Sequence, residues 1–380
     1  MSKKKNKKGN KLPFVIFGIV SVLILSVLIG CYLLLTNYYK KMNYENRLSN
    51  PSDYVLDETE PHTEDVTGEV TEPSREETPQ EEVDAFKQAA KEAAQNLGIE
   101  DLKSDDVTNI LLIGSDTRNA GDGGNSDTMM LISINNKTKR IVCTSFLRDL
   151  YVHIPHKDIW DKINASFAWG GVNLLLDTIE SNFSLKIDQY IMVDFFSFVN
   201  VVDILGGLDV EVKEDELYWC NQYIHASNLL LEEDEFSDYL EYADGTPQHL
   251  SGKQVLAYSR FRYVGNADFS RTERQRYVIN LIFDKIKTSD FNTLKKLLDS
   301  FLPEITTNLT QDDFFKLIYI VPDMANYDII SWGLPDQDFK YITVNKQSSI
   351  GIDFAYYIKK LYGLIYTEKT MDDYNTSENN

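Results

Sequence analysis

Arginines in two adjoining stretches of the sequence are the first candidates for chemistry. Arg260 and Arg262 stand two positions apart in YSRFRYV, so in an extended segment both side chains point to one face. Ser270 and Glu273 have the spacing of a capping box, which predicts a helix that starts near Arg271. A guanidinium group matches two phosphate oxygens at once, and a helix N-terminus attracts anions. These residues therefore predict a phosphate or pyrophosphate site.

Further groups follow along the same predicted helix. Arg271, Arg274 and Gln275 stand at positions i, i+3 and i+4, so they share one helical face. An arginine-rich helix that only faces solvent is the alternative interpretation. We favour an anion site because the charges come from two different elements.

Two aspartates flank a glycine-rich loop in GSDTRNAGDGGNSDTMM. Asp116 follows a predicted strand and Asp127 opens the next one, so both carboxylates are expected at adjacent strand ends. Carboxylate oxygens suit Mg²⁺, although aspartates in such loops also serve turn geometry alone. A divalent cation would reconcile these acids with a pyrophosphate held by arginines. Phosphoryl transfer needs this combination of positioning and charge neutralisation.

Other reaction classes lack their motifs. The sequence has no GxxxxGK(S/T) loop for a nucleoside triphosphate and no GxSxG motif for acyl transfer. Arg148 and Asp149 follow the predicted strand KRIVCTSF, where such a pair is commonly an ordinary salt bridge. The cysteines show no CxxC spacing, which argues against a structural zinc site. Cys143 is expected to be a buried, inert thiol, and a disulfide between Cys143 and Cys220 stays open.

The elements that must position these groups alternate between strands and helices from Val107 onward, which predicts a sheet covered by helices. NILLIG, TMMLISI, KRIVCTSF and QYIMVDF read as strands, and KINASFAWGGVNLLLDTIESNF reads as a helix. Further helices are expected from Ser251, from Arg271, and over residues 293–302, 311–318 and 351–362.

The N-terminal 35 residues predict a membrane anchor. Residues 12–35 form an apolar run without a charged side chain, long enough to span a bilayer as a helix. Residues 1–11 are rich in lysine, so the positive-inside rule places the N-terminus in the cytoplasm and the rest of this single-pass protein outside. A cleaved signal peptide is the alternative, but its apolar region is typically shorter.

Residues 36–105 after this anchor read as a linker. The stretch from Asp53 to Glu82 is rich in Asp, Glu, Thr and Pro, which predicts an extended acidic spacer. VDAFKQAAKEAAQNLG then predicts a short helix. The net charge of −21 argues against a nucleic-acid partner, since phosphate backbones require a basic surface. An anion site must therefore be a local cluster.

Several motifs in fixed order make the chain resemble the LytR–CpsA–Psr family of wall-polymer ligases. The motifs are GSDTR, SDTMMLISIN, the RD pair, DKINASFAWGG, DILGGLDVEV, LSGKQVLAYSRFR and DFSRTERQR, over residues 107–285. The resemblance implies an α/β/α sandwich with a central mixed sheet that encloses a hydrophobic, lipid-binding pocket. The catalytic domain would span residues 106–366, followed by a polar tail, 367–380.

The resemblance also implies an activity at the bacterial cell membrane, with the catalytic domain extracellular. An anionic glycopolymer of the teichoic acid or capsular polysaccharide type would pass from undecaprenyl-pyrophosphate to a peptidoglycan hydroxyl, with Mg²⁺ as cofactor. The implied metal ligands are Asp116 and Asp127, and Asp127 or Asp149 would act as base. The implied pyrophosphate ligands are Arg148, Arg260, Arg262, Arg271 and Gln275, with Arg274 as a further candidate. Lys162 and Asn164 would line the pocket mouth, although Asn164 could instead cap a helix.

The sequence departs from the family pattern at two places, and two other functions are alternatives to polymer transfer. Leu147 stands where the family often has proline before the Arg–Asp pair. Residues 217–242 look like an acidic, aromatic insertion that gates the lipid pocket, binds acceptor glycan or only covers the surface. A non-enzymatic regulator that binds polyprenyl phosphate would keep the arginines without needing a metal. A polyprenyl-pyrophosphate hydrolase would use the same site with water as acceptor.

Overall fold

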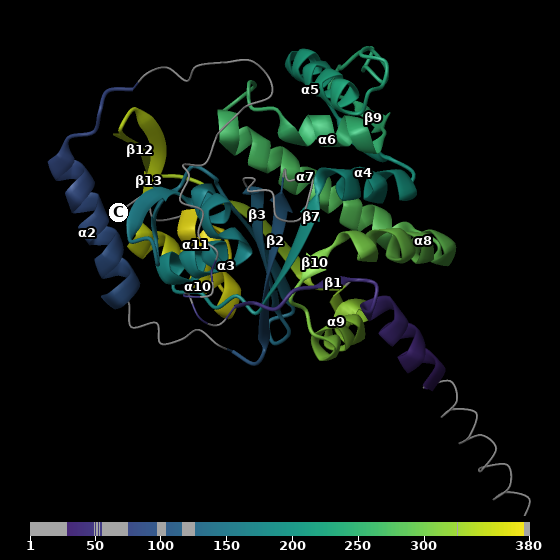
Figure 1. The fold of residues 1–380 in the computed structure, drawn as a ribbon, viewed down its shortest axis with the longest axis horizontal. Helices are drawn as coiled ribbons and strands as arrows, with labels where there is room; N and C mark the ends of the chain where they lie inside the picture. Colours follow the sequence, from purple (N-terminus) through teal and green to yellow (C-terminus); the bar gives the residue numbers. More distant parts are fainter. Residues whose placement is uncertain are drawn as a thin grey trace, which may run out of the picture.

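A seven-stranded mixed sheet forms the centre of the computed structural model, which describes residues 29–48, 50, 52, 54, 75–96, 104–115, 126–324 and 326–375. The strand order is β1-β10-β7-β2-β3-β4-β11 (Figure 1). Strands β2, β3 and β4 pair antiparallel, whereas β7 and β11 add in parallel at either side. The strands are β1 (Asn43–Tyr44), β2 (Val107–Ser115), β3 (Ser126–Asn135), β4 (Arg140–Phe146), β7 (Gln189–Asp194), β10 (Thr306–Thr307) and β11 (Asp328–Leu334).

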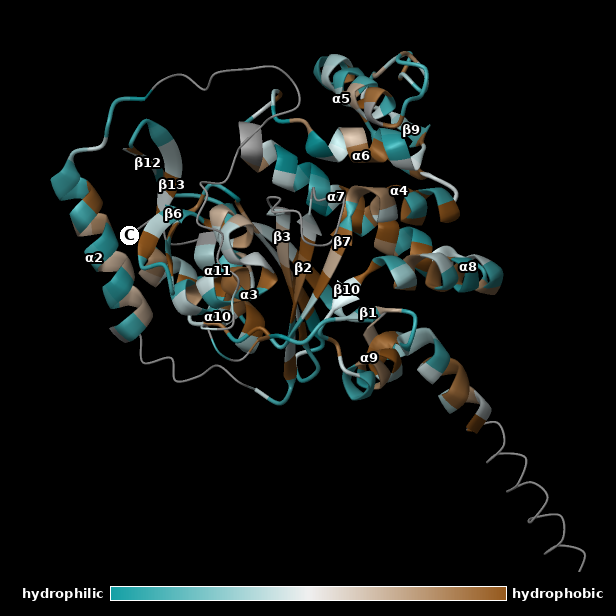
Figure 2. Cartoon of the chain, in the orientation of Figure 1, coloured by the Kyte–Doolittle hydropathy of each residue, from teal (hydrophilic) through white to brown (hydrophobic). Residues whose placement is uncertain are grey.

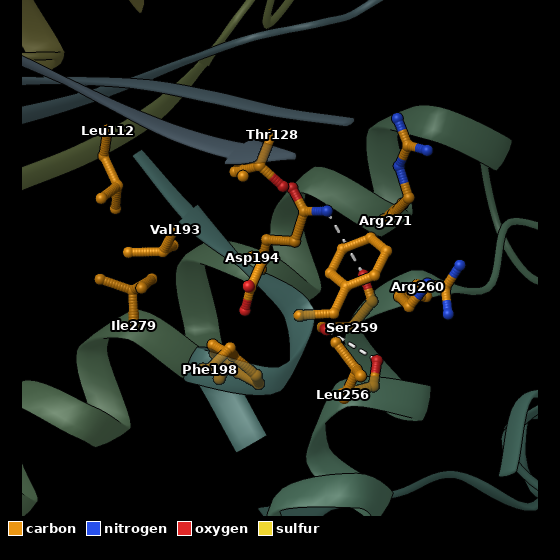
Figure 3. Close-up of a pocket in the computed structure, with 14 residues that line it drawn as sticks. Leu112, Thr128, Val193, Asp194, Phe198, Leu256, Ser259, Arg260, Arg271 and Ile279 are labelled. Carbon is orange, nitrogen blue, oxygen red and sulfur yellow. Dashed lines mark hydrogen bonds between the residues drawn. The ribbon is translucent and has the colours of Figure 1, made fainter. Parts of the chain in front are cut away.

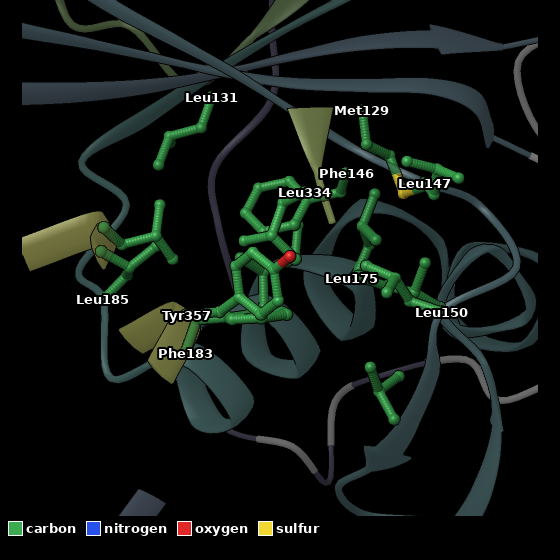
Figure 4. Close-up of a cluster of buried hydrophobic side chains, with 14 of the residues drawn as sticks. Met129, Leu131, Phe146, Leu147, Leu150, Leu175, Phe183, Leu185, Leu334 and Tyr357 are labelled. Carbon is green, nitrogen blue, oxygen red and sulfur yellow. The ribbon is translucent and has the colours of Figure 1, made fainter. Parts of the chain in front are cut away.

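Side chains on one face of the sheet pack against the helices α3 (Ile163–Phe183) and α10 (Phe354–Tyr366). Helix α2 (Gln80–Asn96) packs in turn against α3 and α10. Leu111 and Ile113 of β2 belong to this core. Met129 and Leu131 of β3 point into it, together with Phe183 and Tyr357 from the helices (Figure 4). The residues between them on β2 and β3 point the other way, because side chains alternate along a strand.

The opposite face of the sheet is covered by α7 (Ala267–Thr288) and α9 (Gln311–Met324). Ile110, Met130 and Ile134 from the strands pack against Leu317 and Ile320 of α9. The central strands are buried on both faces and largely apolar, and Figure 2 shows them as the hydrophobic centre of the fold. The predicted α/β/α sandwich with a central mixed sheet is therefore confirmed.

A group of helices beside the sheet has its own core. It contains α4 (Phe195–Ile204), α5 (Leu217–Leu230), α6 (Gly252–Arg260) and α8 (Phe291–Phe301), which pack with α7. The predicted insertion at residues 217–242 contains α5, whose Cys220 and Ile224 are fully buried in this cluster. The remaining elements are the hairpins β5–β6 (Tyr151–Ile154, Ile159–Lys162), β8–β9 (Leu208–Glu211, Pro247–Leu250) and β12–β13 (Phe339–Val344, Gln347–Ile352), the short helices η2 (Glu214–Glu216) and η3 (Leu302–Glu304), and α11 (Asp372–Asn375).

The expected element boundaries are confirmed in part. The helix after Ser251 is α6, with the Ser251–Gln254 capping box in place, and the short linker helix is α2. The helix expected from Arg271 starts earlier, at Ala267, so Ser270 lies inside it and its hydroxyl accepts from the Asn266 N–H. The helix expected over residues 351–362 starts at Phe354, since Gly351 belongs to β13.

The cysteines are free. Cys143 lies in β4 and Cys220 in α5, both buried, so the disulfide left open by the sequence is absent. Burial raises the pKa of the Cys143 thiol to about 11, which keeps it protonated and inert as expected.

The chain joins the domain directly after its apolar N-terminal run. Residues 29–39 form a helix, and Asn43–Tyr44 then pair with β10 as a strand of the main sheet. Across the described residues, no helix combines the length and apolar composition needed to cross a membrane. Residues 12–28 of the predicted anchor and residues 55–74 of the predicted spacer lie outside the described residues.

An ion-pair network holds this entering segment on α3. One Arg47 nitrogen, Nη2, lies 2.6 Å from both Asp177 and Glu180, and the Tyr54 hydroxyl donates to Asp177 at 2.6 Å. Burial alone would raise the pKa of Asp177, but hydrogen bonds from Tyr54, Arg47 and His156 outweigh it and hold that pKa below its ordinary value of 3.8.

Replacing Arg47 by alanine should lower the free energy of unfolding by about 2 kcal/mol at neutral pH, because Asp177 and Glu180 lose their shared cation. The contribution of Asp177 is present above its unfolded pKa and is lost as pH falls through its lower folded pKa. The difference between Arg47→Ala and the parent should therefore shrink in acid. Urea unfolding at neutral and acidic pH measures it. Lys295→Ala removes an exposed pair with Asp299 and is the matched control. Equal losses in both variants would contradict the role of Arg47.

Candidate functional site

An apolar cavity with arginines at one end lies between the sheet and the helices α4, α6 and α7. Its volume is about 90 Å³. Leu112, Val193 and Ile279 lie at one end of it, and Arg260 and Arg271 at the other (Figure 3). The full lining is Leu112, Gly114, Thr128, Val193, Asp194, Phe195, Phe198, Leu256, Ser259, Arg260, Arg271, Gln275, Val278 and Ile279.

The ends of three neighbouring strands supply the floor of the cavity. Leu112 and Gly114 come from β2, Thr128 from β3 and Asp194 from β7. A Cβ atom on Gly114 would lie 3.0 Å from the Cβ of Thr128, so glycine lets β2 and β3 approach closely beside a register shift in their pairing. The sheet therefore places the cavity where its central strands end.

Arg260 is the last residue of α6, which ends at the cavity. Its guanidinium carbon lies 4.3 Å from the ring centroid of Phe195 and 5.6 Å from that of Tyr223. Phe261 follows with extended backbone, so the expectation of one extended segment through both Arg260 and Arg262 is wrong at Arg260. Cation–π contacts restrain the guanidinium while its nitrogen donors stay available for an anion.

Arg271 and Gln275 reach the same cavity from α7. They stand one turn apart on that helix, and Arg271 is only 3 % exposed. The Gln275 amide donates to the Ser259 carbonyl of α6 at 3.4 Å, which ties the two helices together. Side chains from two elements thus meet at one place, as expected, while their role as pyrophosphate ligands stays a prediction.

Arg274 does not share this cavity. Its guanidinium is buried 3.7 Å from the ring centroid of Phe261, donates to the Phe261 carbonyl and pairs with Glu216 at 3.3 Å. Burial lowers the pKa of Arg274, although Glu216 opposes that shift. Arg274 shares a helical face with Arg271 and Gln275, but that face borders two environments, the cavity and the buried surroundings of Glu216. The expectation that Arg274 binds pyrophosphate is therefore wrong. Arg262 is half-buried in the loop after α6 and does not line the cavity either.

A second polar cluster lies where β4 ends. Asp149 is 7 % exposed and pairs with Lys162 Nζ at 2.7 Å, and Arg148 Nε lies 3.9 Å from the same carboxylate. The Asn164 backbone N–H donates to the Arg148 carbonyl at 3.3 Å. The structure brings these four predicted residues together. Asn164 is the second residue of α3 rather than its cap, because Lys162 holds the N-cap position.

Leu147 explains the departure before the Arg–Asp pair. Its backbone N–H donates to the Leu334 carbonyl of β11 at 3.0 Å, and its side chain is fully buried in the main core. Proline could not make this hydrogen bond. Leucine here therefore attaches the end of β4 to the neighbouring strand.

Asp116 and Asp127 are the two predicted metal ligands. Asp116 lies outside the described residues, and the side chain of Asp127 in β3 is not described either. Ser115, which precedes Asp116 in the sequence, pairs with Ser126, which precedes Asp127. Two carboxylates are the kind of oxygen donors that a hard cation such as Mg²⁺ takes. Among the described side chains, no group of three or more His, Cys, Asp or Glu gathers for a metal.

Asp194 is a cavity residue that the sequence analysis missed. Its carboxylate accepts from the Ser197 backbone N–H and hydroxyl, both at 2.7 Å, and so caps α4. An aspartate between a predicted strand and a helix, with serine three positions later, was the available signal. The remaining missed lining residues are apolar and carried no distinguishing pattern.

A family model with the description LytR_cpsA_psr family matches residues 66–357, which is more than half of the chain. The chain belongs to this family. The resemblance seen in its motifs is therefore confirmed.

Curated relatives of the family give names for comparison. The "Polyisoprenyl-teichoic acid--peptidoglycan teichoic acid transferase TagU" of Bacillus licheniformis is 35% identical over 222 residues, 57% of this chain and 65% of that protein. The protein of the same name from Bacillus cereus is 30% identical over 243 residues, 62% of this chain and 72% of that protein. The match to the first of these spans less than two thirds of its length.

Solved structures of the family share the fold. The structure "TagT bound to LI-WTA" superposes with a TM-score of 0.55 at 25% identity and covers 70% of this chain and 95% of that one. A structure of the "LytR-CPS2A-psr family protein YwtF (TagT) with bound octaprenyl pyrophosphate lipid" gives 0.51 at 24% identity, over 70% and 95% of the two chains.

Replacing Arg274 by alanine should destabilise the protein by about 3–5 kcal/mol, because the Glu216 carboxylate would stay buried without its cation. The double variant Glu216→Met with Arg274→Met should recover most of that loss. Chemical unfolding of the purified chain measures both. Arg260→Ala, which removes a half-buried cation, should shift unfolding by less than about 1 kcal/mol. An Arg274→Ala protein as stable as the parent would return Arg274 to the list of binding residues.

Proposed function

We propose that the chain is a phosphotransferase that attaches an anionic glycopolymer from undecaprenyl-pyrophosphate to peptidoglycan. The observation that carries the proposal is an apolar cavity that ends in Arg260 and Arg271, two cations from separate helices. A molecule with a hydrocarbon chain and a pyrophosphate has this same order of apolar and anionic parts. Membership in a family whose relatives are named teichoic acid transferases supports the polymer class.

The size of the cavity sets a condition on the proposal. Its volume of about 90 Å³ is below the roughly 300–1,000 Å³ of typical ligand pockets. A polyprenyl chain therefore requires neighbouring side chains to move apart. The α4 side chains Phe195 and Phe198 line the cavity, and Phe196 beside them is exposed. Rotation of α4 phenylalanines would widen the space without breaking the sheet.

The transfer step follows from the arrangement of charges. The acceptor hydroxyl oxygen would attack the phosphorus that carries the polymer, and the bond from that phosphorus to the bridging oxygen would break. Polyprenyl phosphate leaves, and Arg260 and Arg271 would stabilise the negative charge that develops on it. A Mg²⁺ ion held by Asp116 and Asp127 would neutralise further phosphate charge. The hydroxyl proton passes to a carboxylate.

Asp127 and Asp149 stay the two candidates for the base. Asp149 pairs with Lys162 at 2.7 Å, and Asp127 would contact Mg²⁺, so a neighbouring cation opposes protonation of either carboxylate. Through its pair with Lys162, Asp149 would also position Lys162 and Arg148 at the exit of β4. The anchor over residues 12–35 would keep this domain outside the cell, where peptidoglycan lies.

Arg260→Ala and Arg271→Lys should each slow transfer by about 10- to 100-fold, since a hydrogen bond to a charged oxygen contributes about 1.5–3 kcal/mol. Lysine in place of Arg271 keeps the charge but cannot bind two phosphate oxygens in the bidentate geometry of a guanidinium group. The assay joins polyprenyl-pyrophosphate-linked sugar to peptidoglycan, with full-length protein. Arg75→Ala is the matched control, because that arginine stacks on Tyr341 and does not line the cavity. Equal transfer rates in Arg260→Ala, Arg271→Lys and Arg75→Ala would contradict a role of Arg260 and Arg271 in binding the pyrophosphate.

Removing the divalent cation with a chelator should abolish transfer, and added Mg²⁺ should restore it. The Asp116→Asn and Asp127→Asn variants should stay inactive in transfer after Mg²⁺ is added. Electron paramagnetic resonance with Mn²⁺ should show weaker metal binding in each. A non-enzymatic binder of polyprenyl phosphate would tolerate both changes. Release of free polymer without peptidoglycan would instead favour the hydrolase.

A further inference from the structure

One side of helix α9 presents apolar side chains to solvent. Tyr319 is 85 % exposed, and Ile318 and Val321 are also exposed. Phe315, Ile318, Tyr319 and Pro322 stand at positions i, i+3, i+4 and i+7, so they form one stripe along the helix. The opposite side of α9 packs in the core through Leu317 and Ile320. The helix thus has two apolar sides, and only one of them is covered.

The helix over residues 29–39 continues this exposed apolar stripe (Figures 1 and 2). The rings of Tyr32 and Phe315 lie 5.5 Å apart, and the Gln311 amide donates to the Thr36 hydroxyl at 2.9 Å. Ile29, Leu33 and Leu34 are exposed beside them. We name the two stripes together the interfacial surface: Ile29, Tyr32, Leu33, Leu34, Phe315, Ile318, Tyr319, Val321 and Pro322.

The attachment of residues 29–48 makes the position of this surface a property of the domain. Pairing of β1 with β10 and the ion pair of Lys41 with Asp299 at 2.6 Å fix the segment on its side of the fold. Arg47 adds its contacts to α3. A membrane crossed by residues 12–35 would therefore lie directly beside α9, without a flexible spacer between them.

We propose that the interfacial surface lies in the headgroup region of the lipid bilayer and fixes how the domain sits on the membrane. The proposal rests on the anchor described under the proposed function. The uncharged run of residues 12–28 continues directly into Ile29. The lipid that would surround this run would therefore extend to the interfacial surface. Tyrosines belong at membrane interfaces, and amphipathic helices lie along them. Lys40 and Lys316 are exposed at its edge, where Lys316 also pairs with Asp313 at 3.3 Å, and both would face anionic lipid headgroups.

The position of α9 links this surface to the cavity. Leu317 and Ile320 on the covered side of α9 belong to the same hydrophobic cluster as Leu112 and Ile279, which line the apolar end of the cavity. A helix is about 10 Å across with its side chains. The apolar end of the cavity would thus lie about one helix away from the lipid that supplies its substrate.

Quenching by brominated lipid tests the proposal on the full-length chain in vesicles of phosphatidylcholine and phosphatidylglycerol. Tyr319→Trp introduces a reporter on the interfacial surface, and the emission of the parent protein is subtracted. Bromine in the acyl chains near the headgroups should reduce the emission of the new tryptophan by about half. Tyr242→Trp is the matched control, because Tyr242 is 56 % exposed near α5, and its emission should not change.

Each outcome decides the question. Quenching at position 319 but not at position 242 supports the proposal. A floated, membrane-bound protein whose reporter at 319 is unquenched overturns it and leaves the anchor intact. Emission at 319 that shifts to shorter wavelength without quenching also overturns it, because a second protein copy would then cover the surface. Protein that stays out of the vesicle fraction overturns the proposal together with the anchor.

Discussion

The convergence of like charges at the end of an apolar cavity is the interaction on which the site depends. Arg260 and Arg271 come from helices joined through Gln275 and the Ser259 carbonyl, so neither cation can move away freely from the other. Stacking on Phe195 partly offsets the repulsion around Arg260. An anion with two phosphates would neutralise both cations, and the proposed pyrophosphate ligand carries this charge.

The central sheet gives this site its rigid frame. Both faces of β2 and β3 are buried. A shift of one residue in their pairing would exchange the side chains on the two faces and disturb the packing of both layers. The ends of β2, β3 and β7 meet the cavity at fixed positions, and the β4 exit fixes Arg148 beside Asp149. Helix α9 packs on this sheet through Leu317 and Ile320 and contributes its opposite side to the interfacial surface, which relates the cavity to the proposed membrane contact.

Much of the fold was predictable because its signals are local. Apolar runs marked the strands β2, β3, β4 and β7, and the Ser251–Gln254 capping box marked α6. Strand β11 was missed, since DIISWGL pairs with a strand that is remote in sequence. Arg274 was misassigned for a related reason: its helical position is known from spacing, but the Glu216 that neutralises it lies 58 positions away.

The sequence by itself determined the family, the α/β class and the residue types of the proposed anion site, because motif order and periodicity are local features of the chain. Only the tertiary structure decided which arginines share a cavity and which one is a buried core cation. It also decided that the segment after the apolar N-terminal run pairs with the main sheet. Such choices depend on contacts between distant residues, and their energies exist only once the chain has folded.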